Sequence, residues 1–234
     1  MAQSSAQKMG CDIKKIQGPT LTIAVGASKE PFHVHKSIIC ASSPFFEKAM
    51  SGPWKESKER TFELPENDPR IFTLYSHWLY FAKIPEVPKD AASHGKAQKH
   101  SRVYHDLVKA YVLGDKLLDI KFQNSVLDAI VEKRYESGAR SGTHYLPCIN
   151  TINLTYFKTT ESAGIRKLFV DMYVRGATEE CLSGEFTKPF LCSVAQGPIK
   201  SRAPVHKRIR AFDYHVKSTM ETQNLKRKRS KEKL

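Results

Sequence analysis

Hydrophobic and polar residues alternate over short stretches near the start of the chain. Residues 20–25 alternate threonine or alanine with leucine, isoleucine and valine, and residues 32–34 resume the alternation after a loop that begins at Gly26. Phe62 and Leu64 alternate in the same way further on. A period of two is typical of a half-buried strand. These patterns predict a β-hairpin followed later by a third strand.

The chain is organised around residues 31–50, which have the sequence PFHVHKSIICASSPFFEKAM. This stretch predicts the end of a strand followed directly by two short helices. His35 begins the first helix. Ser43 is placed to cap the second helix, and Pro44 fits the first helical position, where no N–H is needed. The preceding strand is expected to pair with this stretch, and the later helices are expected to cover it.

Apolar residues at helical spacing predict the next helix. Asp68 and Pro69 form a typical helix start, a capping side chain followed by proline. A wide apolar stripe follows, made by Ile71, Phe72, Tyr75, Trp78, Leu79 and Ala82. Core packing accounts for most of the aromatic residues in this region. The width of the stripe also suggests that one face packs inside the domain while another meets a partner.

Residues 83–102 interrupt this pattern. They contain Pro85, Pro88 and Gly95 and almost no large apolar residue, which predicts a mobile loop of about twenty residues. Helical spacing returns over residues 104–118, where Gly114 indicates the close approach of a neighbouring helix because glycine costs about 1 kcal/mol relative to alanine there. Asp119 is placed to cap a further helix.

The pattern divides the chain into four segments. Residues 1–17 are polar and expected to be disordered, residues 18–137 form one domain, and residues 138–196 form a helical extension. From Gly197 to residue 234 the chain is polar and basic, which predicts a disordered tail.

The order of motifs in the first half resembles the BTB/POZ domain, and most closely its fungal members. In that family the first helix begins at a histidine–lysine pair and the second at a serine, so His35, Lys36 and Ser43 are the fold-defining positions. The resemblance implies an α/β (α+β) fold with a small β-sheet flanked by a cluster of helices, here with a C-terminal helical extension. The matching motifs are FHVHK (32–36), SPFF (43–46), LPENDP (64–69), WLY (78–80) and YVLGDKL (111–117).

The resemblance further implies a non-enzymatic protein–protein interaction module that self-associates as a scaffold. Animal members form homodimers with a buried pair between an aspartate and a basic residue. Lys36 matches the basic residue, but Thr20 stands near the position of the aspartate. Self-association is therefore expected, with a geometry that differs from the animal one.

A second interpretation makes the chain a substrate adaptor of a cullin-type ubiquitin ligase. Some animal members bind cullin through an apolar residue and a glutamate just after the second helix, and Trp54 and Glu56 match these positions. Burial of a tryptophan would anchor such a contact. The alternative is that Trp54 covers the domain's own core while Glu56 is solvated.

Positive charge is concentrated in the tail. The formal net charge is +14, and residues 198–234 hold 12 Lys/Arg against 3 Asp/Glu. Lys226, Arg227, Lys228 and Arg229 form a candidate nuclear-import signal. The alternative is a solvated tail that touches nucleic acid or acidic partners only nonspecifically, and the expected location is nuclear or cytoplasmic.

The sequence offers little chemistry for catalysis or metal binding. The five cysteines form no CxxC pair and no zinc spacing with histidine. His33 and His35 lack a nearby third ligand, which favours a structural His35 with its ring bonded to backbone. Hydrolase, phosphate-loop and zinc-protease motifs are absent from the sequence. We therefore expect no enzyme activity, no cofactor and no metal, and the apolar runs are too short for a membrane span.

Overall fold

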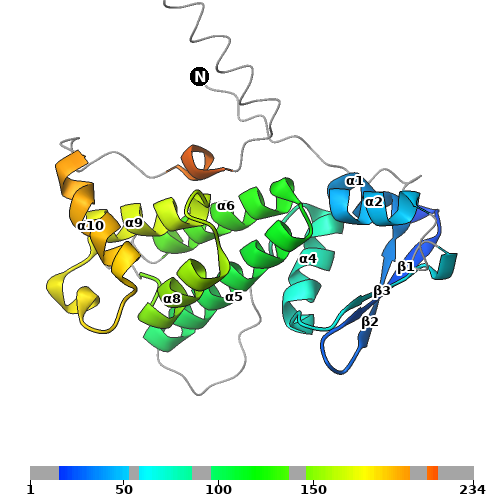
Figure 1. The fold of residues 1–234 in the computed structure, drawn as a ribbon, viewed down its shortest axis with the longest axis horizontal. Coiled ribbons are helices and arrows are strands. Elements are labelled where there is room, and N and C mark those ends of the chain that lie inside the picture. Colours follow the sequence, from blue (N-terminus) through cyan, green and yellow to red (C-terminus); the bar gives the residue numbers. More distant parts are fainter. Residues whose placement is uncertain (1–15, 53–57, 86–95, 137–145, 201–209, 216–234) are drawn as a thin grey trace, which may run out of the picture. The chain divides into compact units, whose positions relative to one another are not determined.

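The computed structural model describes residues 16–52, 58–85, 96–136, 146–200 and 210–215. Its contacts divide the chain into two compact units. The first unit combines residues 1–88 with residues 113–125, and the helical unit combines residues 89–112 with residues 126–234. Figure 1 shows the elements of both units.

A three-stranded sheet forms the centre of the first unit. Strand β1 (Thr20–Val25) pairs antiparallel with β2 (Glu30–His35) and parallel with β3 (Thr61–Leu64), which gives the order β2-β1-β3 (Figure 1). The hairpin and the third strand are confirmed. The turn after β1 uses Gly26, whose positive φ of 77° is readily available to glycine. Its N–H donates to the Leu64 carbonyl at 3.0 Å, which ties the hairpin to β3.

Three helices of the first unit begin where the sequence predicts. Helix α1 is Lys36–Ser42, α2 is Pro44–Ser51 and α4 is Pro69–Phe81. Ser43 and Asp68 cap α2 and α4 by accepting backbone N–H groups, and a proline follows each cap. These caps satisfy donors that a helix leaves free at its start.

Aromatic rings fill the core of the first unit. Phe46 lies with its ring centre 5.1 Å from that of Phe62, and Phe122 lies 4.8 Å from Tyr75 and 5.2 Å from Trp78. All five of these side chains are buried. Each large ring removes roughly 150–250 Å² from water, so such residues dominate core energetics. The prediction that core packing explains most of the aromatic stripe is confirmed.

Two long helices contribute residues to both units. They are α5 (Lys96–Lys116) and α6 (Ile120–Glu136). Helix α5 starts inside the segment predicted as a loop over residues 83–102, so that prediction is wrong from Lys96 onward. Alanine, glutamine and lysine near this start favour helix without supplying an apolar stripe, which explains why periodicity missed it.

The prediction at Gly114 is confirmed. A Cβ at this position would lie 2.8 Å from the Gln123 side chain and 3.1 Å from the Phe122 ring, both on α6. The absence of a side chain at Gly114 lets α5 and α6 approach closely in the first unit. This contact brings Phe122 into the aromatic core.

The helical unit contains α8 (Ile149–Lys158), α9 (Gly164–Gly176) and α10 (Lys188–Lys200), with short 3-10 helices η2 (Glu179–Leu182) and η3 (Ala211–Tyr214). Figure 1 shows α8, α9 and α10 side by side. The apolar spacing around residues 149–156 and 165–172 correctly predicts α8 and α9. Buried side chains on these helices and their connections pack with buried residues of α5 and α6 in the core of the unit: Ile152, Leu168, Phe169, Met172, Tyr173, Phe186 and Phe190.

Part of the predicted disordered tail is ordered. Helix α10 continues past Gly197 to Lys200, and residues 211–214 form η3. Tyr214 is the buried side chain of η3, and one buried residue leaves no periodic pattern in the sequence. Residues 201–209 and 216–234 lie outside the described residues, and the predicted domain limits stay predictions.

The structure confirms a small sheet flanked by helices, an α+β architecture. In the part of the chain that the structure describes, no helix combines the length and the apolar character needed to cross a membrane.

Candidate protein-interaction site

The structure describes some of the predicted site residues and not others. His35 precedes α1, Lys36 is its first residue, and Ser43 lies between α1 and α2. Trp54 and Glu56 lie outside the described residues, as do the basic residues 226–229. Of the predicted site, the structure therefore describes His35, Lys36 and Ser43, the residues at the starts of α1 and α2.

Ser43 joins distant parts of the first unit. Its hydroxyl accepts the Phe46 N–H at 3.4 Å and donates to the Leu117 carbonyl at 2.6 Å. The residue is completely buried. One side chain thus caps α2 and also satisfies a carbonyl at the end of α5.

A buried carboxylate lies beside this serine. Asp119 Oδ2 accepts from the Ser42 hydroxyl at 2.5 Å and from the Tyr75 hydroxyl at 3.0 Å. Its Oδ1 accepts the Phe122 N–H at 3.0 Å, which confirms Asp119 as a helix cap. Every oxygen of this carboxylate therefore has a donor, as a buried charge requires.

Burial dominates the electrostatics of the cluster. It raises the pKa of the Asp119 carboxyl, although the hydrogen bonds from Ser42, Phe122 and Tyr75 oppose the rise. Burial also raises the pKa of Tyr75 well above its usual value, and the neighbouring charge of Asp119 raises it further. Tyr75 therefore remains a neutral donor at physiological pH. The sequence predicted Asp119 only as a cap, because its link to α1 and α4 depends on tertiary contacts.

His35 has a partner that the sequence did not indicate. Its ring Nδ1 lies 2.8 Å from the Tyr80 hydroxyl, and its backbone N–H donates to the same oxygen at 3.1 Å. The ring is therefore bonded to a side chain of α4, and the prediction of a bond to backbone is wrong. Within the described ranges no group of three or more His, Cys, Asp or Glu residues is placed to hold a metal ion.

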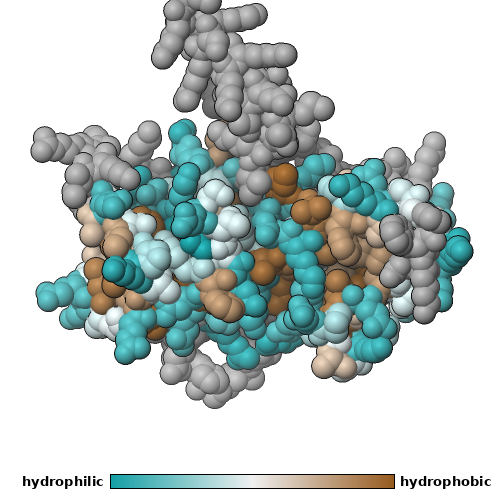
Figure 2. Space-filling model, in the orientation of Figure 1, coloured by the Kyte–Doolittle hydropathy of each residue, from teal (hydrophilic) through white to brown (hydrophobic). Residues whose placement is uncertain are grey.

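Helix α2 presents a partly exposed apolar edge. Phe46 and Met50 are buried in the core, while Phe45 and Ala49 remain half-buried. The Phe45 ring packs edge-on against Phe46 with 5.1 Å between ring centres. Because α2 ends at Ser51, this edge immediately precedes the segment that carries Trp54 and Glu56. Figure 2 shows hydrophobic side chains at the surface of the first unit.

A second partly apolar surface lies where β1 begins. Thr20 is exposed and pairs with His35, while Lys36 is half-buried and its N–H donates to the Pro19 carbonyl at 2.9 Å. Ile16, just before β1, is 41% exposed. The position expected to carry an aspartate therefore presents a hydroxyl to solvent beside a basic residue.

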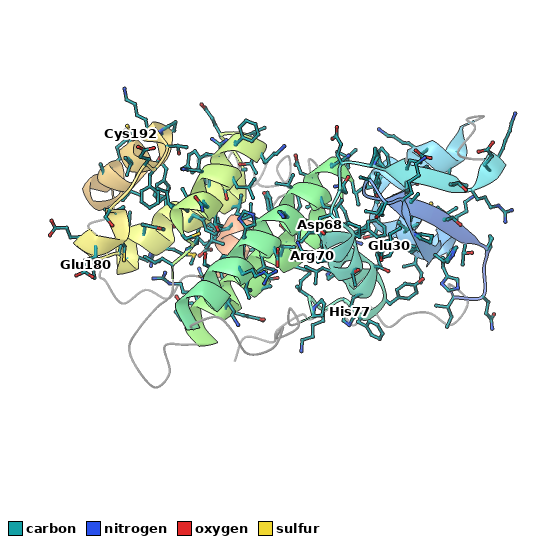
Figure 3. The ribbon with its side chains drawn as sticks, turned by 90° about the horizontal axis from the view of Figure 1, so that it is seen from below. Glu30, Asp68, Arg70, His77, Glu180 and Cys192 are labelled. Atoms are coloured by element: carbon teal, nitrogen blue, oxygen red, sulfur yellow. The ribbon has the colours of Figure 1, made fainter. Side chains whose placement is uncertain are left out.

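The start of α4 is polar. Arg70 and Asp68 form an ion pair at 2.8 Å between Nη2 and Oδ2, and Figure 3 shows these two side chains together, with His77 farther along the same helix. The His77 ring packs at a tilt against the exposed ring of Phe81, with 4.6 Å between ring centres. Exposed ion pairs contribute about 0–1 kcal/mol to stability, so the pair itself adds little beyond the cap that Asp68 provides for α4.

A small mixed sheet flanked by helices, with buried polar contacts between them, defines an α+β domain. Residues 14–109 match the family model described as BTB/POZ domain. The fold is that of a BTB domain, and the family is a non-enzymatic protein–protein interaction module. The predicted resemblance is confirmed at this level, while the closer likeness to fungal members stays a prediction.

Proposed function

We propose that this chain is a self-associating scaffold whose BTB/POZ domain binds a second copy. The start of β1 supports this proposal, because Ile16, just before the strand, is 41% exposed. The half-buried Lys36 lies near the same start, since its N–H donates to the Pro19 carbonyl. Burial of exposed apolar area is the main favourable contribution to association. A second copy would remove Ile16 from water, and Lys36 would add polar specificity at the rim.

This contact differs from the one that the resemblance implies. Thr20 supplies no negative charge for Lys36, so a pair between an aspartate and a lysine does not arise from these two positions. Apolar contact around Ile16 would then supply more of the affinity, and charge would supply less. The self-association should accordingly depend only weakly on salt.

Light scattering of the full chain after size separation tests this proposal. We expect twice the mass of one chain for the unmodified protein and the mass of one chain for Ile16→Glu, because a charge at a contact costs desolvation. Lys58→Glu, at an exposed position of the first unit, is the control and should keep the double mass. A single-chain mass for the unmodified protein at every concentration would refute self-association.

The second candidate function is that of a cullin adaptor. The half-buried Phe45 and Ala49 favour it, because they give an apolar edge to α2, the helix that precedes Trp54 and Glu56 in the sequence. An apolar anchor next to a charged rim residue is a common arrangement in protein interfaces. The extension or tail would then recruit the substrate.

Calorimetric titration of the full chain with the N-terminal domain of a fungal cullin tests this function. Adaptor activity requires micromolar or tighter binding, about −8 kcal/mol or better, that Glu56→Lys abolishes. Glu66→Lys makes the same charge change at an exposed residue of the first unit and should bind as the unmodified chain does. Absence of heat with the unmodified chain would remove the adaptor function and leave the scaffold.

A further inference from the structure

A short segment near the C-terminal end of the chain folds back onto the helical unit. Figure 1 shows η3 in orange-red beside α6 and α9. Tyr214, its last residue, is 9% exposed, and its hydroxyl donates to Asp171 Oδ2 on α9. Burial raises the pKa of this hydroxyl, and the bond to Asp171 raises it further. The tyrosine therefore stays protonated and remains a donor at physiological pH.

The backbone of the segment also fits a specific place. A Cβ at Gly164 would lie 2.2 Å from the Tyr214 carbonyl oxygen and 3.6 Å from the Leu127 side chain. Only glycine at this position lets the segment approach so closely. Gly164 begins α9 and Leu127 lies on α6, so these two helices together form the surface on which the segment packs.

The residue after η3 makes a further polar contact. His215 Nε2 lies 2.9 Å from Asp128 Oδ1 on α6. This surface therefore supplies two carboxylates: Asp171 accepts from the Tyr214 hydroxyl, and Asp128 contacts the His215 imidazole. Because the two carboxylates contact adjacent residues, a peptide in this position would need a tyrosine followed directly by a histidine.

The rest of the segment contributes little to holding it in place. Phe212 is 72% exposed, and Arg210 and Asp213 pair with each other at 3.5 Å on the outside. Helix η3 has four residues and lacks a side-chain cap. Tyr214 is its single buried side chain, so the contact resembles that of a short peptide ligand more than that of a core element.

We propose that the surface formed by Leu127, Asp128, Gly164 and Asp171 is a binding site for a short peptide containing adjacent tyrosine and histidine, and that residues 210–215 occupy it as an internal ligand. A partner that carries such a peptide binds by displacing this segment. The site belongs to the helical unit and shares no residue with the self-association surface, which belongs to the first unit, so neither proposal depends on the other.

Tethering sets how strongly the internal ligand competes. Residues 201–209 connect α10 to the segment, and a short connection gives an effective concentration on the order of millimolar. A free peptide with a dissociation constant of about 0.1 mM would then appear about tenfold weaker against the intact chain than against a chain whose segment is released.

The test uses a fluorescein-labelled peptide of sequence RAFDYH and the full chain in fluorescence anisotropy. Tyr214→Ala releases the internal ligand, and we expect it to bind the peptide at least tenfold more tightly than the unmodified chain does. The same peptide with phenylalanine in place of tyrosine should bind more weakly, because it cannot donate to Asp171. Adding Gly164→Ala to Tyr214→Ala should abolish binding, because the methyl group occupies the position of the peptide carbonyl.

Circular dichroism verifies that each variant keeps its helices. If Tyr214→Ala loses them, Tyr214→Phe replaces it and should show a smaller gain of about threefold. The proposal is overturned if the peptide fails to bind the released chain at millimolar concentration, binds the intact chain equally well, or still binds after Gly164→Ala. A doubled mass in light scattering that Tyr214→Ala alone removes would show exchange of the segment between two copies, which would overturn its assignment as an internal ligand.

Discussion

Single residues that serve two elements at once hold the first unit together. Ser43 caps α2 and also donates to the Leu117 carbonyl, 74 positions away in sequence. A buried carbonyl that loses its donor costs about 1–3 kcal/mol, and loss of a helix cap costs about 1 kcal/mol. A serine of this kind should contribute far more than an exposed serine on the same helix.

Ser43→Ala should therefore lower the free energy of unfolding by about 2 kcal/mol, because it removes the cap and leaves the Leu117 carbonyl without this donor. Ser51→Ala is the matched control, since Ser51 is exposed and its hydroxyl donates to the Glu47 carbonyl within α2; it should change the value by less than about 0.5 kcal/mol. Urea unfolding followed by circular dichroism measures both. Equal effects of the two substitutions would contradict the double role of Ser43.

Of the two contacts that Ser43 makes, the sequence predicts only the helix cap. A serine followed by a proline at the start of a helix is a local pattern, so the cap at Ser43 was predictable. The bond to Leu117 and the carboxylate of Asp119 beside it join residues that only the folded chain brings together. The same distinction applies to His35, whose place at the helix start was predicted and whose partner Tyr80 was not.

Contacts between consecutive elements stabilise the helical unit. Arg166 on α9 donates to the carbonyls of Tyr156 and Thr159 at the end of α8, and its guanidinium lies 4.4 Å from the centre of the Tyr156 ring. The last carbonyls of a helix have no partner within it. Arg166 therefore caps one helix from the start of the next and fixes the turn between them.

Arg166→Lys should cost about 1–3 kcal/mol, because lysine cannot reproduce the planar fork that meets two carbonyls and a ring. Lys167→Arg makes the reverse exchange at the next, exposed position and should stay within about 0.5 kcal/mol. Thermal unfolding of the two variants beside the unmodified chain provides the measurement. An Arg166→Lys variant as stable as the unmodified chain would show that α8 ends without help from α9.

Periodicity was sufficient for most elements and failed where packing is not periodic. It predicted the hairpin, α4, α8 and α9 because each buries one face. It missed the start of α5 at Lys96, where helix propensity acts without an apolar stripe, and it missed η3, which depends on one buried tyrosine.

At the scale of the whole molecule, order along the chain and order in space differ. The first unit takes in residues 113–125 after the chain has already entered the helical unit at residue 89. No compositional break in the sequence marks an excursion of this kind, and the single domain expected over residues 18–137 stays a prediction. The parallel pairing of β3 with β1 was unpredicted for a similar reason, since strand patterns carry no direction.

The sequence shows where the positive charge lies, but it does not show which partner that charge binds. Residues 226–229 form a dense basic run whose role in nuclear import stays a prediction, as does the nuclear or cytoplasmic location. Trp54 and Glu56 likewise stay predictions that the cullin titration addresses directly.

The link between Ser42 and Asp119 spans 77 positions, and this separation has a consequence during synthesis. A ribosome adds ~5–20 residues per second, so about 4–15 seconds pass between the two residues. The hairpin of β1 and β2 is local and can close early, whereas Tyr75 and Trp78 must wait for Phe122 to complete their packing. For those seconds the nascent chain carries an aromatic surface that Phe122 does not yet cover, and transiently exposed apolar surface of this kind is prone to aggregate.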